Sequence, residues 1–249
     1  MEHLVLPLAS TTVIVDFGSR SGIVSGAREA ASAHGGNRWG HGVSVGLTPL
    51  GVATLLGVPM REVGGNGIEL ADLMGSVATE LPGMLGALRS WDERFDVLEA
   101  LLGVAFRGGS RSVKLGRVRE GVRKHGVEPE AAVTAAWWRL QRAEPPRVGV
   151  LADELGVSRR RLERGFRQHI GMSPATVARI ARFQRVVGRF GAGASPADAA
   201  AGSGFADQSH LARETRAMAG MTPSALAAHL RTPPIVVSQT SKTGGARRF

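Results

Sequence analysis

The feature that most constrains the fold is an internal repeat in the C-terminal part of the chain. Two series of residues recur with an offset of 49 and with identical internal spacing. A glycine-containing turn precedes each series, at Gly156 in the first and at Gly204 in the second. Such a repeat indicates that one supersecondary unit occurs twice. The two series are Leu162, Phe166 and Gly171-Met172-Ser173-Pro174 in the first copy and Leu211, Thr215 and Gly220-Met221-Thr222-Pro223 in the second.

The first copy has the pattern of a helix-turn-helix. Leu151, Ala152 and Leu155 fall on one face of a short helix, and Gly156 supplies a tight turn. Ser158 can cap a second helix that runs to about His169. Charged side chains, most of them arginines, surround the narrow apolar stripe of this second helix. A helix with this pattern is suited to enter a major groove of DNA. A helix that is merely solvated usually mixes positive and negative charges and carries more Lys or Glu. The charged side chains of this helix are Arg159, Arg160, Arg161, Glu163, Arg164 and Arg167.

The second copy is less basic. Ser195-Pro196 begins a helix that ends near Ala201, and Asp198 is placed to complete a capping box. After the turn at 202–205, a helix over 207–219 presents Leu211, Thr215 and Met218 inward. Gln can pair with adenine and Arg with guanine, although the polar Thr215 weakens the expected core. The outward side chains are Gln208, Ser209, His210, Arg213 and Arg216.

A long helix from Ser173-Pro174 to about Phe190 connects the copies. We expect its Arg182 and Arg185 to contact DNA phosphates. A rigid connection of about 34 Å would place both reading helices in successive major grooves. Its predicted inner face comprises Val177, Ile180, Ala181, Gln184, Val187 and Gly188.

The charge distribution supports a polyanionic partner for this part of the chain. Residues 1–144 carry 15 basic and 15 acidic side chains, whereas residues 145–249 carry 16 and 6, so the whole net charge of +10 lies in the second part. A solubilising surface is the alternative explanation. The chain contains no cysteine, which excludes disulfides, thiolate metal sites and a cysteine nucleophile.

Residues 147–230 resemble the DNA-binding domain of AraC-type transcription regulators. The resemblance rests on LADELGVSRRRLERGFRQHIGMSP, PATVARIARFQRV and GFADQSHLARETRAMAGMTPSAL. It implies sequence-specific DNA binding that regulates transcription, although the family usually has Phe where Leu211 and Thr215 stand. The alkylation-repair relatives in this family need a nucleophilic cysteine, which this chain lacks. The resemblance assigns base reading to Arg160, Glu163, Arg164, Gln208, Ser209, His210 and Arg213.

The N-terminal part is predicted to be an α+β domain, with the C-terminal domain all-α. Strands are expected near 12–17, 22–25 and 42–47, and helices near 49–56, 69–74, 76–89, 91–106 and 129–142. The segments VLPLASTTVIVDFG, GVSVGLTPLGVATLLGVPMREV and IELADLMG resemble a domain that precedes such DNA-binding modules in actinobacterial regulators. Pro145-Pro146 marks the boundary. The expected domains are 1–144 for sensing or oligomerisation, 145–231 for DNA binding, and a mobile tail over 232–249.

Other candidate sites have simpler explanations. His34 and His41 flank a glycine-rich loop that has no third metal ligand nearby, and Gly64-Gly65-Asn66-Gly67 lacks the context of a phosphate-binding loop. Trp137-Trp138 could line a ligand pocket, but one ring more often lies in the core while its neighbour covers a surface between domains. His169 and His210 have no nucleophile beside them. The sequence therefore predicts no enzymatic activity and no metal or cofactor site.

The expected partners follow from the predicted DNA-binding role. They are double-stranded DNA and RNA polymerase or other transcription machinery, with a small-molecule effector left open. No membrane segment is expected; we predict a cytoplasmic location and either a monomer or a homodimer. Two alternatives remain at this point: a non-specific DNA-binding architectural protein, and a protein-interaction module with degenerate helix-turn-helix units.

Overall fold

The N-terminal part is built on a small antiparallel sheet in the strand order β5-β2-β3-β6. We describe it from a computed structural model that covers residues 3–34, 40–64, 67–107 and 130–231. Val13 on the central strand pairs with Val24 on one side and Val45 on the other. Burial alternates along β2, as expected for a strand that packs one face on a core. The strands are β2 (Thr11–Asp16), β3 (Ile23–Ser25), β5 (Gly42–Leu47) and β6 (Ile68–Glu69).

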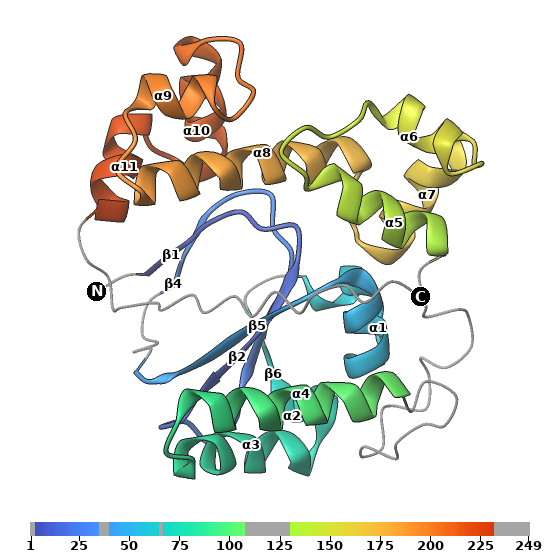
Figure 1. Cartoon of the computed structure of the whole chain (residues 1–249), viewed down its shortest axis with the longest axis vertical. Coiled ribbons are helices and arrows are strands. Elements are labelled where there is room, and N and C mark those ends of the chain that lie inside the picture. The colour runs from blue at the N-terminus through green and yellow to red at the C-terminus, as the bar shows by residue number, and fades with distance from the viewer. Residues whose placement is uncertain (1–2, 35–39, 65–66, 108–129, 232–249) are drawn as a thin grey trace.

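A separate two-stranded ribbon lies between this sheet and the C-terminal helices (Figure 1). It pairs β1 (His3–Val5) with β4 (Ser32–His34) in antiparallel register. An isolated bridge between Leu8 and Arg28 links the two chain segments that lead away from it. The ribbon and these segments therefore reach from the sheet toward the helices.

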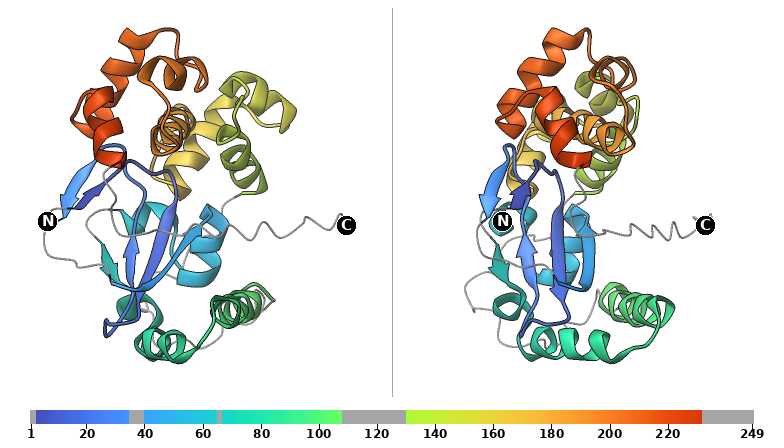
Figure 2. Two further views of the ribbon diagram at one scale, coloured as in Figure 1. Left: turned by 60° about the vertical axis from the view of Figure 1, so that its left-hand side comes forward. Right: turned by 90° about the vertical axis from the view of Figure 1, so that its left-hand side faces the viewer.

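Five helical segments complete the described residues of the N-terminal part. Thr48 caps the first of them by accepting a hydrogen bond from the Gly51 backbone N–H at 2.9 Å, with Pro49 at the first helical position. In Figures 1 and 2, α3 (Ser76–Ala87) and α4 (Trp91–Arg107) lie at the end of the sheet away from the C-terminal helices. The segments are α1 (Pro49–Leu56), the 3-10 helix η1 (Met60–Val63), α2 (Leu70–Met74), α3 (Ser76–Ala87) and α4 (Trp91–Arg107).

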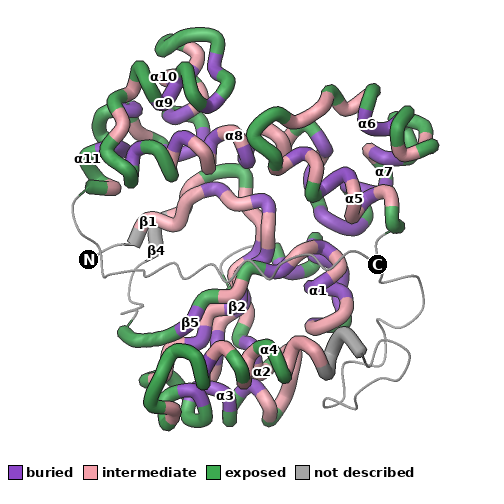
Figure 3. The backbone as a smooth tube through the Cα atoms, in the orientation of Figure 1, coloured by how far each residue is buried: buried purple, intermediate pink, exposed green. Residues whose placement is uncertain are grey.

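The C-terminal part is entirely helical within the described residues. One group of helices contacts each end of a long central helix, α8 (Pro174–Gly191) (Figure 1). Figure 3 shows buried stretches, coloured purple, in both groups and along α8. The first group comprises α5 (Ala131–Leu140), α6 (Val148–Glu154) and α7 (Arg159–His169), and the second comprises α9 (Pro196–Ala201), α10 (Gln208–Ala219) and α11 (Pro223–Arg231).

The predicted fold class is confirmed: an α+β part precedes a helical one. The predicted strands and helices occur within a few residues of the observed bounds, whereas β1, β4, β6, η1 and α11 were not predicted. The inner face of α8 differs from the prediction. Its buried set includes Phe183, Val186 and Phe190, while Gln184 and Val187 are half-buried and Gly188 is exposed. The cause is that helices cover α8 from several directions, which a single apolar stripe does not anticipate.

Two further expectations can be compared with the described residues. None of the helices in the described ranges is long and apolar enough to cross a membrane. The expected mobile tail over 232–249 lies outside these ranges, as do two residues of the predicted turn over 64–67.

Candidate nucleic-acid interface

The first helix-turn-helix is formed by α6 and α7. Gly156 in the turn has a φ of 66°, a conformation that favours glycine. Ser158 then caps α7, because its hydroxyl accepts a hydrogen bond from the Arg161 backbone N–H at 3.2 Å. Leu151 and Phe166 are fully buried between the two helices and their neighbours. The predicted turn, cap and inner face of this copy are confirmed, and we call α6, the turn and α7 the first module.

Helix α5 packs closely against the first module. A Cβ atom at Gly165 of α7 would lie 2.6 Å from Val133 Cγ2, so the two helices approach more closely than a side chain at this position allows. Arg139 of α5 also forms an ion pair with Glu154 of α6. Helix α5 precedes the predicted domain boundary at Pro145, yet it contacts α7 and α8. The boundary itself stays a prediction.

The outer face of α7 carries exposed arginines of two kinds. Arg159 pairs with Glu163 at 2.9 Å, and Arg161 pairs with Glu130 at 3.1 Å. In the part of the chain that the structure describes, three exposed arginine side chains of this helix have no hydrogen-bond or ion-pair partner. They are Arg160, Arg164 and Arg167. Exposed guanidinium groups without a protein partner are suited to contact base edges and phosphates.

The second module is formed by α9, the turn and α10. Ser195 caps α9 by accepting from the Asp198 backbone N–H at 3.2 Å, and its hydroxyl lies 2.6 Å from the Asp198 carboxylate. Gly204 in the turn has a φ of 76°. Asp207 caps α10 by accepting from the His210 backbone N–H at 2.6 Å. The second copy of the repeat is therefore also a helix-turn-helix, with the same cap and turn devices as the first.

Thr215 lies in the core of the second module, where the sequence predicted a weak position. It is fully buried, and its hydroxyl donates to the Leu211 carbonyl oxygen at 2.8 Å. The hydroxyl is thereby satisfied within its own helix, so its burial leaves no unpaired polar atom. Leu211 and Met218 are buried beside it, as predicted.

The outward side chains of α10 are mostly exposed. Gln208 and Ser209 stand at its N-terminal end. His210 is only half-buried, and its ring meets the Phe205 ring edge-on at a centroid distance of 5.1 Å. Arg213 and Arg216 are exposed farther along the helix. The structure thus presents the predicted polar side chains of α10 at the surface, with His210 held against the turn.

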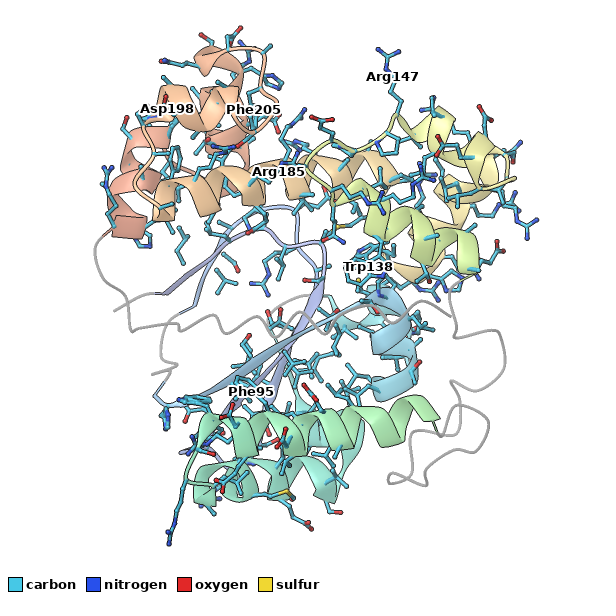
Figure 4. The ribbon with its side chains drawn as sticks, viewed as in Figure 1. Phe95, Trp138, Arg147, Arg185, Asp198 and Phe205 are labelled. Atoms are coloured by element: carbon cyan, nitrogen blue, oxygen red, sulfur yellow. The ribbon has the colours of Figure 1, made fainter. Side chains whose placement is uncertain are left out.

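Arginines of α8 contact the second module and the segment between α5 and α6. The Arg182 guanidinium carbon lies 4.9 Å from the centroid of the Phe205 ring, in the second module. Arg185 donates through Nη1 to the Arg142 carbonyl oxygen at 3.0 Å, just after α5. Arg179 pairs with Glu214 of α10 at 2.6 Å. Figure 4 shows Arg185 on α8 between the two groups of helices. These contacts hold the second module and the end of the α5 region against α8.

The N-terminal part also contacts the helices that carry the modules. The Trp137 indole donates to the Ala9 carbonyl oxygen at 2.9 Å, and the Gln184 side chain donates to the carbonyl oxygen of Pro7. The Ala31 backbone N–H donates to the Met218 carbonyl oxygen at 2.6 Å, near the end of α10. The ribbon region therefore touches α5, α8 and α10.

The first module has a further contact with the N-terminal part at η1. Arg61 of η1 donates to the carbonyl oxygen of Gln168 at the end of α7. The neighbouring His169 is buried and its Nδ1 has no hydrogen-bond partner among the described residues. Burial lowers the pKa of His169, Arg61 lowers it further, and Glu130 opposes the shift. His169 therefore lies where the end of α7 meets η1 of the N-terminal part.

The other residues singled out from the sequence fall outside this surface. Trp137 is buried in the core and Trp138 is 56% exposed, so the two rings have the separate environments that the sequence suggested. His41 meets the Phe17 ring edge-on at 5.0 Å. The described residues hold no cluster of three His, Cys, Asp or Glu side chains that would suit a metal ion.

Arg147 is a candidate contact that the sequence did not single out. It is exposed at the start of α6 and projects away from the protein (Figure 4). Its position immediately after Pro145-Pro146 was the available signal, because prolines end the preceding helix and leave the next residue at a helix start.

Comparison with known proteins identifies the helical part. A family model described as a helix-turn-helix domain matches residues 151–229, the span from α6 into α11. Residues 151–229 form an AraC-type helix-turn-helix domain. The matched residues contain α7, α8, α9 and α10 in full and α6 from Leu151 onward, so the DNA-binding domain spans both modules.

Two solved structures are similar to the chain. One is a transcriptional regulator with an AraC-type DNA-binding domain from Chromobacterium violaceum, with 27% identity over 41% of this chain and 91% of the other and a TM-score of 0.36. The other is the apo form of a ToxT point variant from Vibrio cholerae, with 13% identity over 88% of this chain and 86% of the other and a TM-score of 0.42. A search of curated proteins gave no match.

Proposed function

We propose that the AraC-type domain reads a two-part DNA site, with α7 and α10 in successive major grooves. The observation that carries this proposal is the pairing of two capped, outward-facing helices on the one continuous helix α8. A continuous helix keeps its two ends at a fixed distance, and two major grooves on one face of DNA are separated by roughly 34 Å.

Side chains on both reading helices would supply the contacts. In the first module, Arg160 and Arg164 are exposed and without a protein partner among the described residues, so their guanidinium groups are available for guanine edges. In the second module, the Gln208 amide can pair with an adenine edge and the Arg213 guanidinium with a guanine edge. The remaining proposed contacts, to bases or backbone, are Arg159, Arg161, Glu163, Arg167, Ser209, His210, Arg216, Arg182 and Arg185.

The N-terminal part is proposed to modulate DNA binding through its contacts with the helices. Hydrogen bonds from Trp137 and Gln184 tie α5 and α8 to the segment over Pro7–Ala9, and Ala31 binds the end of α10. A small molecule or a second copy that displaced this segment would change how firmly the modules are held. We propose no catalytic activity, and we place the regulator with its DNA in the cytoplasm.

The proposal is tested by selecting bound sequences from a random duplex pool with the full chain at physiological salt. We expect a motif of two parts whose centres lie about one helical turn apart. Enrichment of a single half-site would contradict a reading role for one module. Binding without enrichment that disappears as salt rises would favour an architectural DNA-binding protein, and no DNA binding would favour a protein-interaction module.

A further inference from the structure

The end of α7 is held by the N-terminal part at η1, beside a buried histidine. Arg61 of η1 donates to the carbonyl oxygen of Gln168, the residue before the last of α7. A Cβ atom at Gly171, just after this helix, would lie 3.0 Å from Arg61 Cβ, so the two segments approach closely. His169 ends α7 and is buried, and its Nδ1 has no hydrogen-bond partner among the described residues. An ionisable side chain is thus enclosed beside a guanidinium that fastens α7 to η1.

The second reading helix is held at the same end by a contact that cannot titrate near neutral pH. The Ala31 backbone N–H donates to the carbonyl oxygen of Met218 at 2.6 Å, again at the residue before the last of its helix, α10. Met218 lies 49 residues after His169, so the two occupy the same position of the internal repeat. Both side chains are buried, but only the imidazole can gain a charge. The repeat therefore has a proton-sensitive group at one of two equivalent helix ends.

Protonation of His169 would bring two positive charges together. Burial lowers the pKa of His169, the Arg61 guanidinium lowers it further, and Glu130 opposes the shift. Glu130 already pairs with Arg161 at 3.1 Å, and Glu62 pairs with Arg61 at 3.4 Å. The imidazolium would therefore be buried against a like charge, with the nearby carboxylates already engaged. The helices packed on α7 add two further ion pairs, Arg139 of α5 with Glu154 of α6 and Arg179 of α8 with Glu214 of α10.

We infer that protonation of His169 releases the end of α7 from η1, so that the first module is held at neutral pH and freed in acid while the second stays held. The inference rests on the proposed modulation of DNA binding by the N-terminal part, and it names the proton as a signal for that modulation. A proton binds more tightly to the released form, in which the imidazole is solvated, than to the held form. A fall in pH below the ordinary histidine value of about 6.5 therefore shifts the population toward release.

Distances between spin labels on the full chain test the release, because the sequence contains no cysteine and a label attaches only where one is introduced. Glu80→Cys on α3 is combined in turn with Arg164→Cys on α7 and with Arg213→Cys on α10, which occupy the same position in the two copies of the repeat. All three side chains are exposed. Without DNA, and between about pH 7.5 and 5, we expect the distance distribution to position 164 to broaden in acid. The distribution to position 213 should stay unchanged.

His169→Met is the main variant, because Met218 is buried at the equivalent position of the repeat and cannot be protonated. It should keep the neutral-pH distribution to position 164 throughout the titration, and His169→Gln serves if the Met variant unfolds. His229→Gln, at an exposed position on α11, is the matched control and should broaden in acid like the wild type. A wild-type distribution that ignores pH, or acid broadening that persists in the His169 variants, would overturn the inference. Parallel broadening to position 213 with loss of far-UV circular dichroism would show global unfolding and overturn it as well.

Affinity for the selected two-part DNA site separates this inference from the proposed function. In the unlabelled full chain, we expect the ratio of affinities at about pH 7.5 and 5.5 to differ roughly fivefold or more between the wild type and His169→Met, as for a typical coupling between sites. The same ratio in both proteins would overturn the regulatory role of His169 while two-part selection stood. Failure to select a DNA site would contradict the proposed function, whereas the label distances, measured without DNA, would still support or overturn the release.

Discussion

Trp137 of α5 donates its indole N–H to the carbonyl oxygen of Ala9 over 2.9 Å, across 128 residues of sequence. The ring is buried, and α5 in turn packs against α7 through the close approach of Val133 to Gly165. One hydrogen bond thus connects the N-terminal segment to the helix that packs against α7. This gives the N-terminal part a short physical route to the proposed DNA-binding surface.

Trp137→Phe should destabilise the protein by about 1–3 kcal/mol, because it removes the N–H that binds the Ala9 carbonyl and leaves a small cavity beside the smaller ring. Chemical denaturation followed by far-UV circular dichroism measures this loss. Trp138→Phe is the matched control: its ring is 56% exposed, so we expect a change within about 0.5 kcal/mol. Equal effects of the two substitutions would show that neither the bond to Ala9 nor the burial of the Trp137 ring contributes to stability.

The local devices of the two modules could be predicted from the sequence, whereas their long-range contacts could not. Ser158 and Ser195 cap helices within three residues of themselves, and Gly156 has the positive φ that its turn position suggested. The approach of Arg182 to Phe205 depends on the crossing of α8 with a turn 23 residues away in the sequence. No periodicity encodes such a crossing.

The same distinction explains what was missed elsewhere. Strands β1 and β4 have three residues each, and they are stabilised by pairing with each other across the intervening chain. Segments this short carry little alternation, and β4 (Ser-Ala-His) has none of the β-branched residues that made the equally short β3 recognisable. The ion pair of Arg161 with Glu130 likewise joins α7 to the residue before α5, which changes the environment of one predicted DNA contact without any sequence signal.

Thr215→Phe should destabilise the second module by about 1–3 kcal/mol, although the family resemblance places Phe at this position. Thr215 is fully buried, so a larger ring would have to displace its neighbours. Ala217→Phe on the exposed side of the same helix is the control, and it should cost less than about 1 kcal/mol. Thermal and chemical denaturation compare the two; a neutral or stabilising Thr215→Phe would show that the core has room for the ring.

His169 should make the protein less stable at mildly acidic pH. Burial lowers its pKa in the folded state, so below the ordinary histidine value of about 6.5 the unfolded chain binds the proton more readily. Stability should therefore be complete above that pH, fall as pH drops below it, and level off once pH passes the lowered pKa. The slope from this one group cannot exceed about 1.4 kcal/mol per pH unit.

Urea denaturation at several pH values between 5 and 8 measures this slope. His169→Gln should flatten the profile below about pH 6.5, whereas His229→Gln, at an exposed position on α11, should retain the wild-type shape. A wild-type profile in His169→Gln would assign the acid sensitivity to other groups, and a profile that rises toward acid would reverse the sign argued for His169.

Arg164→Ala should weaken binding to the selected DNA site by about 1–3 kcal/mol and relax the preference at one base pair. Arg164 is exposed on the outer face of α7, and no described residue pairs with it, so its guanidinium is available to a base edge. Titrations against the selected site, its single-base variants and a random duplex measure both effects. Arg89→Ala, remote from the helices that carry the modules, should bind like the wild type. If Arg164→Ala lost the same affinity on selected and random duplexes, the residue would be a backbone contact, and base reading by the first module would then depend on Arg160 and Glu163.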